Sequence, residues 1–120
     1  MMSENEISYK IRGAIFKVHK KLGPGLLESV YEAALTYELG VKGLKVKTQV
    51  SLPVIYEMVR LDLGFRIDLL VEELVIEAIQ DVHHKQLITY LKLSNRKLGI
   101  LVNFNTDEIS KSIFRKVNGL

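Results

Sequence analysis

The sequence has 120 residues, of which 48% are hydrophobic, and a formal net charge of +3. This length suits one domain, spanning residues 1–120, with one hydrophobic core. There is no cysteine, which excludes disulfide bonds and thiolate metal sites, so any metal ion must be held by oxygen or imidazole ligands. So small a positive charge does not by itself indicate nucleic-acid binding.

The beginning of the sequence does not resemble a secretion signal. Residues 1–9 are polar and acidic, and no apolar run approaches the ~20 residues that cross a bilayer. We therefore expect neither secretion nor membrane insertion. The absence of cysteine agrees with a cytoplasmic protein that uses a hard cation.

Two amphipathic helices are predicted before any strand. The first covers residues 6–22, and Gly23-Pro24-Gly25 ends it. Its apolar stripe consists of Ile7, Ile11, Ala14, Ile15, Val18 and Leu22. The second helix ends near Gly40 or Gly43. Its apolar face consists of Leu27, Val30, Tyr31, Ala34, Leu35 and Leu39.

The apolar period then changes to two, which predicts strands. Alternation over residues 46–52 stops at Pro53, and residues 59–71 alternate again with Leu70 as the one exception. The second run predicts one antiparallel strand with one face on the core. Residues 74–79 read as a returning strand after a tight turn.

The last part of the chain mixes helical and strand patterns. Residues 83–95 have helical spacing, and residues 99–104 form an apolar run suited to a buried strand, which predicts a right-handed βαβ crossover. Residues 109–117 fit either a helix or an edge strand. The resulting α/β fold has a mixed sheet flanked by helices, in the order α, α, β, β, β, α, β with an uncertain final element.

Asp68 and Glu77 form the most suggestive pair of polar residues. If the turn consists of Glu72 and Glu73, Val71 faces Leu74 and Asp68 lies directly opposite Glu77. Two adjacent carboxylates repel each other unless a cation or a proton joins them, which is typical of metal or acid–base sites. Two solvent-facing acids balanced by a nearby arginine would show the same pattern.

Three further positions could contribute to a site. Glu28 lies near the start of the second helix, where the helix dipole explains a carboxylate but where it could also project toward the sheet. Gln86 and Tyr90 share one face of the third helix and could position a phosphate or a water, although an ordinary surface pair explains them as well. His83 and His84 are adjacent and point in different directions, so they make a poor chelating pair.

Basic residues occur in small groups along the chain. Solvated faces and helix ends explain any one group better than phosphate contacts do. The groups are Lys17, Lys20 and Lys21; Lys42, Lys45 and Lys47; Lys92, Arg96 and Lys97; and Lys111, Arg115 and Lys116.

Several segments together resemble a known family. Gly25-Leu-Leu-Glu28-Ser-Val-Tyr31 fits the G-x-x-E-x-x-Y signature of small bacterial proteins named for it, which belong to the PD-(D/E)xK nuclease superfamily. The similarity continues through residues 64–71, 82–93 and 98–104 and covers nearly the whole chain. No single motif is decisive, but their order and spacing make chance similarity improbable.

The resemblance implies a metal-dependent nuclease. In such enzymes an acid from an early helix, an aspartate on one strand and a glutamate on the next bind Mg²⁺ or Mn²⁺, and a lysine two residues beyond that glutamate orients or activates water. Glu28 and Asp68 take the first two acidic roles. Gln86 and Tyr90 match the Q-x-x-x-Y element of the RecB-like branch, which lies beside the site.

The sequence departs from the family in the third motif, where the catalytic lysine is missing. One alignment keeps Glu77 as the metal ligand and puts Ile79 in the place of the lysine, and isoleucine can neither donate a proton nor hold a charge. In a second alignment, which the downstream match favours, a short segment bearing both catalytic groups is absent between Ile76 and Val82.

Three functions follow as hypotheses. The first is a domain descended from metal-dependent phosphodiesterases, with DNA expected over RNA as substrate and with activity dependent on the altered third motif. The second is an inert module that binds nucleic acid or a partner protein through the same basic surface. The third is a structural domain that forms homo-oligomers.

Overall fold

The computed structural model describes residues 3–51, 54–61, 66–72, 74–78, 88–89, 91–92, 96 and 98–118. The elements are α1 (Glu4–Leu22), α2 (Glu28–Val41), β1 (Val46–Ser51), β2 (Val54–Tyr56), β3 (Val59–Leu61), β4 (Arg66–Val71), β5 (Leu74–Ala78), β6 (Leu98–Val102), η1 (Ile109–Lys111) and β7 (Ile113–Val117). Residues 88–89 and 91–92 are also helical, within the predicted third helix. The chain is thus a mixed α/β fold, as the sequence predicts.

Local signals set the bounds of α1. The hydroxyl oxygen of Ser3 accepts a hydrogen bond from the backbone N–H of Glu6 at 3.1 Å and caps the helix. At the other end Gly23 has a φ of 69°, and its N–H donates to the carbonyl of His19 at 2.8 Å. The predicted stripe is buried except at its end, where Leu22 is exposed because the helix stops there.

The second helix is also confirmed, but its buried face is shorter than predicted. Tyr31, Leu35 and Leu39 are buried, whereas Leu27 and Val30 are exposed. Leu27 precedes the first turn and has extended backbone geometry, with φ −66° and ψ 148°. Helical spacing therefore does not apply to Leu27, which explains why its side chain leaves the apolar face.

The main sheet has the strand order β1-β4-β5-β6-β7. Neighbouring strands are antiparallel except β5 and β6, which are parallel, as a β-helix-β crossover requires. In the β4–β5 hairpin Val71 pairs with Leu74 and Leu69 pairs with Ile76, which confirms the predicted register. The tail forms η1 and then β7, so its ambiguity resolves to a strand at the edge of the sheet.

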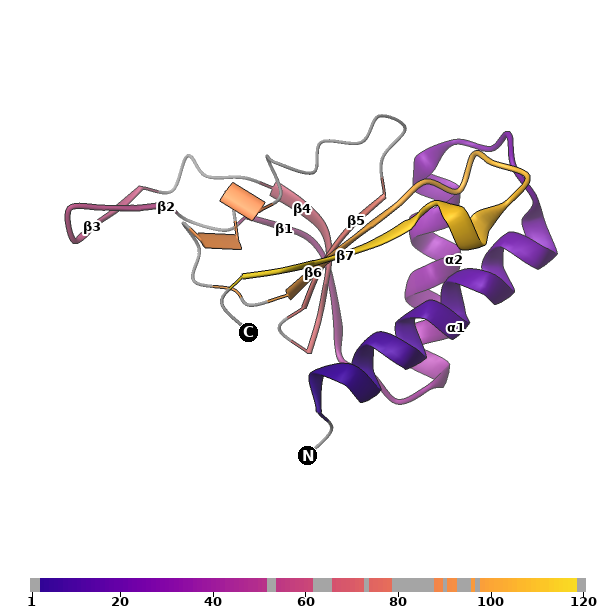
Figure 1. Ribbon diagram of the computed structural model, residues 1–120, viewed down its shortest axis with the longest axis horizontal. Helices are drawn as coiled ribbons and strands as arrows, with labels where there is room; N and C mark the ends of the chain where they lie inside the picture. The colour runs from indigo at the N-terminus through magenta and orange to yellow at the C-terminus, as the bar shows by residue number, and fades with distance from the viewer. Residues whose placement is uncertain are drawn as a thin grey trace.

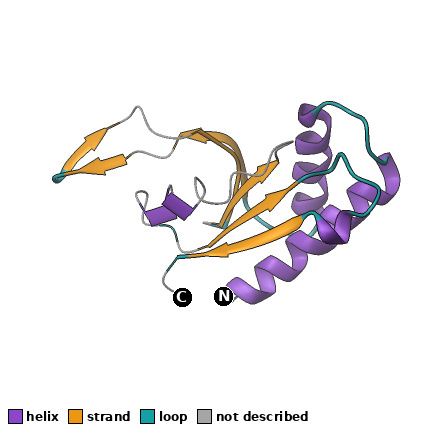
Figure 2. Cartoon of the chain, turned by 45° about the horizontal axis from the view of Figure 1, so that its top comes forward, coloured by secondary structure: helices purple, strands orange, loops and turns teal. Residues whose placement is uncertain are grey.

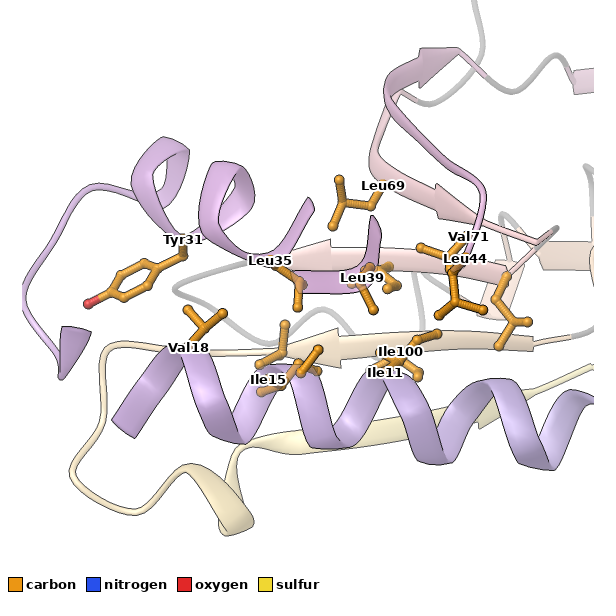
Figure 3. Packing of buried hydrophobic residues seen from close by; sticks show 14 of the residues in the cluster. Ile11, Ile15, Val18, Tyr31, Leu35, Leu39, Leu44, Leu69, Val71 and Ile100 are labelled. Atoms are coloured by element: carbon orange, nitrogen blue, oxygen red, sulfur yellow. The ribbon is translucent and has the colours of Figure 1, made fainter. Parts of the chain in front are cut away.

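Helices α1 and α2 cover one face of this sheet (Figure 1) and form the main core with it. Figure 3 shows the α1 side chains Ile11, Ile15 and Val18 pointing toward α2 and the strands. The strands contribute Leu69, Val71, Leu74, Ile76, Leu98, Ile100 and Val102 to this core. Each fully buried aliphatic side chain contributes roughly 1.5–3 kcal/mol to folding, so this face dominates the stability of the fold.

The opposite face of the sheet also buries apolar side chains. Leu70 and Leu101 are buried without belonging to the cluster under α1 and α2, and so is Leu91 in the third helical segment. The sequence predicts only one covered face for the strand that contains Leu70. Leu70 therefore breaks the alternation because its side chain packs on a second buried surface, on the other face of the sheet.

The prediction of one continuous strand over residues 59–71 is wrong. Residues Val59–Leu61 form β3, which pairs with β2 in a separate two-stranded sheet that projects from the body (Figure 2). Val59 and Leu61 are exposed rather than in the core. Two successive strands that keep the same alternation look like one strand in sequence, because alternation does not show which partner each half pairs with.

Candidate active site

Glu28 is the first residue of α2 and follows the loop that joins the two helices. Tyr31, one turn later, holds that loop: its hydroxyl donates to the carbonyl of Gly23 at 2.6 Å and accepts from the N–H of Leu26 at 3.1 Å. The Tyr31 ring stacks on Phe104, with centroids 4.7 Å apart. The tyrosine of the G-x-x-E-x-x-Y motif thus fixes where the helix begins, and Glu28 is placed by it. The helix dipole also favours a carboxylate at this position.

Tyr31→Phe should therefore lower the stability of the fold. Tyr31 is buried, and its loss would leave the Gly23 carbonyl and the Leu26 N–H without this partner, which costs about 1–3 kcal/mol. Thermal unfolding followed by circular dichroism would measure the change. Tyr37→Phe, at an exposed position of the same helix, is the matched control and should unfold like the wild type. Equal unfolding temperatures for the two variants would contradict this role of the hydroxyl.

Asp68 is a half-buried residue in β4, between the strands β1 and β5. The observed pairs of β4 and β5 include Leu69 with Ile76, and continuing this register by one residue on each strand places Glu77 across from Asp68. Glu77 itself pairs with Leu101 of β6. The backbone therefore has the register from which the carboxylate pair was predicted, although the Glu77 side chain lies outside the described part.

The carboxylates of α2 and β4 come together at the β1 edge of the sheet. The side-chain amide of Gln49, in β1, donates to Oε1 of Glu32 at 2.7 Å and lies 3.5 Å from Oδ1 of Asp68. The longer separation is at the outer limit of a hydrogen bond. Glu28 and Glu32 are four residues apart and share one face of α2. We call Glu28, Glu32, Gln49 and Asp68 the acidic site.

The acids in this site disfavour one another's charge. Burial raises the pKa of Glu28, and the charge of Asp68 raises it further. Burial also raises the pKa of Glu32, with the charge of Asp68 next in effect; the hydrogen bond from Gln49 lowers it, and the charge of Glu28 adds a further rise. Glu28 remains largely exposed as a residue, so its desolvation is partial. A bound cation would reverse the repulsion.

Glu32→Gln should change how stability depends on pH. Because the pKa of Glu32 is raised in the folded state above its ordinary value of 4.5, the folded protein binds more protons, and stability falls as the pH rises from 4.5 through the raised value. Glu32→Gln does not lose stability in this way, because glutamine does not ionise. It should unfold at the same temperature as the wild type below pH 4.5 and at a slightly higher temperature at pH 7, both without metal.

Glu57→Gln provides the control, since Glu57 lies exposed in the turn of the β2–β3 hairpin. It should leave the pH dependence of the unfolding temperature unchanged. A Glu32→Gln variant that is less stable than the wild type at pH 7 would show that the Glu32 charge stabilises the fold.

The other predicted site residues lie outside the described part of the chain. These are Gln86 and Tyr90, whose roles stay predictions; His83, His84 and Ile79 also lie outside the described part. Within the described residues no group of three acids or histidines is arranged to hold a metal ion. The donor chemistry nevertheless fits a hard divalent cation, because Glu28, Glu32 and Asp68 supply carboxylate oxygens that repel one another without one.

Among the described residues, acidic partners lie near two lysines of the basic groups. Lys17 of α1 pairs with Glu38 of α2 at 3.1 Å, and Lys111 pairs with Glu108 at 2.9 Å. Both lysines are well exposed, so each pair contributes little to stability. A position on the solvated surface therefore explains these two lysines, without any contact to phosphate.

Sequence reasoning missed Glu32 and Gln49. The spacing of four residues from Glu28 was a usable signal for Glu32, because it puts both side chains on one helix face. Gln49 gave no such signal. It has a φ of 51°, which the alternation of residues 46–52 does not indicate, and its contacts join elements distant in sequence.

Comparison with known proteins identifies a family. The sequence model of the PD-(D/E)XK nuclease superfamily matches residues 5–116. Neither a curated protein nor a solved structure gives a significant match. Within the described residues, none of the helices has the length and apolar character needed to span a membrane.

Proposed function

The chain belongs to the PD-(D/E)XK nuclease superfamily, and from this premise we propose that it hydrolyses phosphodiester bonds of DNA with the help of a divalent metal ion. The family implies a nucleic-acid substrate and supports the phosphodiesterase chemistry. The preference for DNA over RNA rests on the resemblance of the G-x-x-E-x-x-Y and Q-x-x-x-Y motifs to small nucleases of this kind.

The observation that carries the proposal is the meeting of Glu28 and Glu32 from α2 with Asp68 from β4. Carboxylates that lie close together disfavour one another's charged form unless a cation or a proton joins them. Here Glu28 and Glu32 of α2 lie near Asp68 of β4, and burial, followed by the charge of Asp68, raises the pKa of both helix acids. Keeping such repulsion is typical of sites that bind a cation or transfer a proton.

Glu28, Asp68 and Glu77 are the residues we assign to Mg²⁺ or Mn²⁺. When bound, the ion supplies a Lewis acid that polarises the phosphoryl group and lowers the pKa of water. The carboxylate oxygens of these three residues would be the ligands of the ion. Gln86 and Tyr90 are assigned to orient the phosphate or water beside it.

A cleavage assay tests the proposal. The protein is incubated with single-stranded and double-stranded DNA and with RNA, each with Mg²⁺, with Mn²⁺ or with EDTA. We expect products with DNA and metal and none with EDTA. Products that persist in EDTA would contradict the metal requirement, and faster cleavage of RNA than of DNA would contradict the substrate preference.

A second function, nucleic-acid binding without hydrolysis, is favoured by one feature of the third motif. Ile79, which can neither donate a proton nor hold a charge, stands where the first alignment requires a lysine. The hypothesis of binding without hydrolysis predicts that the protein is retained on DNA and that this retention weakens steeply as the salt concentration increases, because phosphate contacts release counterions. DNA retention without any metal-dependent cleavage would favour this function, and binding insensitive to salt would exclude it.

A further inference from the structure

Gln49 has a backbone conformation that its place in the sheet does not require. Of the non-glycine residues with positive φ in the described part of the chain, Glu57, Met58 and Glu72 all lie in turns, whereas Gln49 lies inside β1. Its φ is 51°, a region that costs a non-glycine residue about 1–3 kcal/mol. The neighbouring residues Thr48 and Val50 still pair with β4.

This conformation coincides with the contacts of the Gln49 side chain. The flanking pairs, Thr48 with Leu69 and Val50 with Ile67, place Gln49 opposite Asp68 in the register. From there its amide reaches Glu32 of α2 at 2.7 Å and Asp68 of β4 at 3.5 Å. One neutral donor therefore connects the two elements that carry the acids of the site.

A neutral amide suits this place better than a charged side chain. Lysine or arginine here would neutralise the carboxylates permanently and compete with a metal ion for them. Glutamine donates hydrogen bonds without adding charge, so it orients the carboxylates and leaves their net negative charge for the cation. Such outer-shell partners commonly tune metal affinity by 10- to 100-fold.

We propose that Gln49 is a positioning residue of the metal site: it bridges Glu32 and Asp68 and sets the spacing at which α2 and β4 present their carboxylates to the ion. This inference rests on the proposed function. It adds Glu32 to the site as the helix carboxylate through which Gln49 acts, and it explains why β1 keeps a strained residue at its centre.

The test compares two variants with opposite effects on the backbone. Gln49→Leu removes the amide and keeps the strain, whereas Gln49→Gly removes the amide and relieves the strain, because glycine adopts positive φ readily. Mn²⁺ is titrated into the full chain and followed by the electron paramagnetic resonance signal of the free ion. We expect both variants to bind Mn²⁺ about tenfold more weakly than the wild type, with Gln49→Gly unfolding at the higher temperature of the two.

The controls separate this inference from the proposed function. Thr48→Val, at the exposed neighbouring position of β1, should bind Mn²⁺ like the wild type. Wild-type affinity in Gln49→Leu or Gln49→Gly, together with loss of binding in Asp68→Asn, would overturn only the role of Gln49. If the wild type binds Mn²⁺ no more tightly than Asp68→Asn does, the metal site itself is wrong and both proposals fall.

Discussion

Asp68→Asn is expected to reduce metal-dependent DNA cleavage by on the order of 100-fold or more, with a parallel loss of Mn²⁺ affinity. Asparagine keeps the size and one oxygen of aspartate but removes the charge. Asp68 is the acid whose charge raises the pKa of both Glu28 and Glu32, so it lies at the centre of the acidic site. Removing its charge therefore weakens the attraction of the site for a cation.

The same change should not weaken the fold. Because Asp68 repels the two helix acids, its neutralisation relieves repulsion in the metal-free protein. We therefore expect an unfolding temperature equal to or above that of the wild type without metal. In contrast, added Mg²⁺ or Mn²⁺ should raise the unfolding temperature of the wild type and not of Asp68→Asn, because only a folded state with an intact site gains binding energy.

Glu57→Gln is the matched control for the loss of one negative charge. Glu57 lies in the turn of the β2–β3 hairpin, which projects away from the body of the molecule in Figure 1. It should cleave DNA and bind Mn²⁺ like the wild type. Equal cleavage by Asp68→Asn and the wild type would refute catalysis at this site.

If Glu77 is the metal ligand, as in the first alignment, Ile79→Lys is expected to raise the rate of DNA cleavage by roughly 100-fold, the lower end of what a positioned acid–base group contributes. The change tests the first alignment, in which Glu77 is the metal ligand and residue 79 is the lysine position. Residues two apart on a strand lie on the same face, so a lysine that continues β5 would lie beside the carboxylate of Glu77. There its ammonium group could orient a water and stabilise developing negative charge.

Met58→Lys controls for the added positive charge. Met58 is exposed in the turn of the β2–β3 hairpin, which projects away from the body of the molecule. It should strengthen retention on DNA at low salt without raising the rate of cleavage. An unchanged rate in Ile79→Lys, with activity restored only when a longer segment is inserted between Ile76 and Val82, would contradict the first alignment and support the second.

The comparison of Glu28 with Gln49 shows what makes a site residue predictable. Glu28 belongs to a local motif, since Tyr31 holds the preceding loop through the carbonyl of Gly23 and the N–H of Leu26, all within nine residues. Gln49 contacts Glu32 and Asp68, which are distant in sequence and join it only after α2 packs on the sheet. The spacing of residues within one segment indicates contacts inside that segment, but it does not indicate contacts between distant segments.

The sequence by itself determined both helices, the β4–β5 register and the family, because each depends on periodicity or on short motifs. Turn length sets the register of a hairpin, and apolar spacing sets the buried face of a helix. The tertiary structure decided that residues 59–61 leave the main sheet, that Leu70 faces a second buried surface, and that Glu32 and Gln49 join Asp68. These outcomes depend on which elements meet, and that choice is made by packing between segments rather than by any pattern within one.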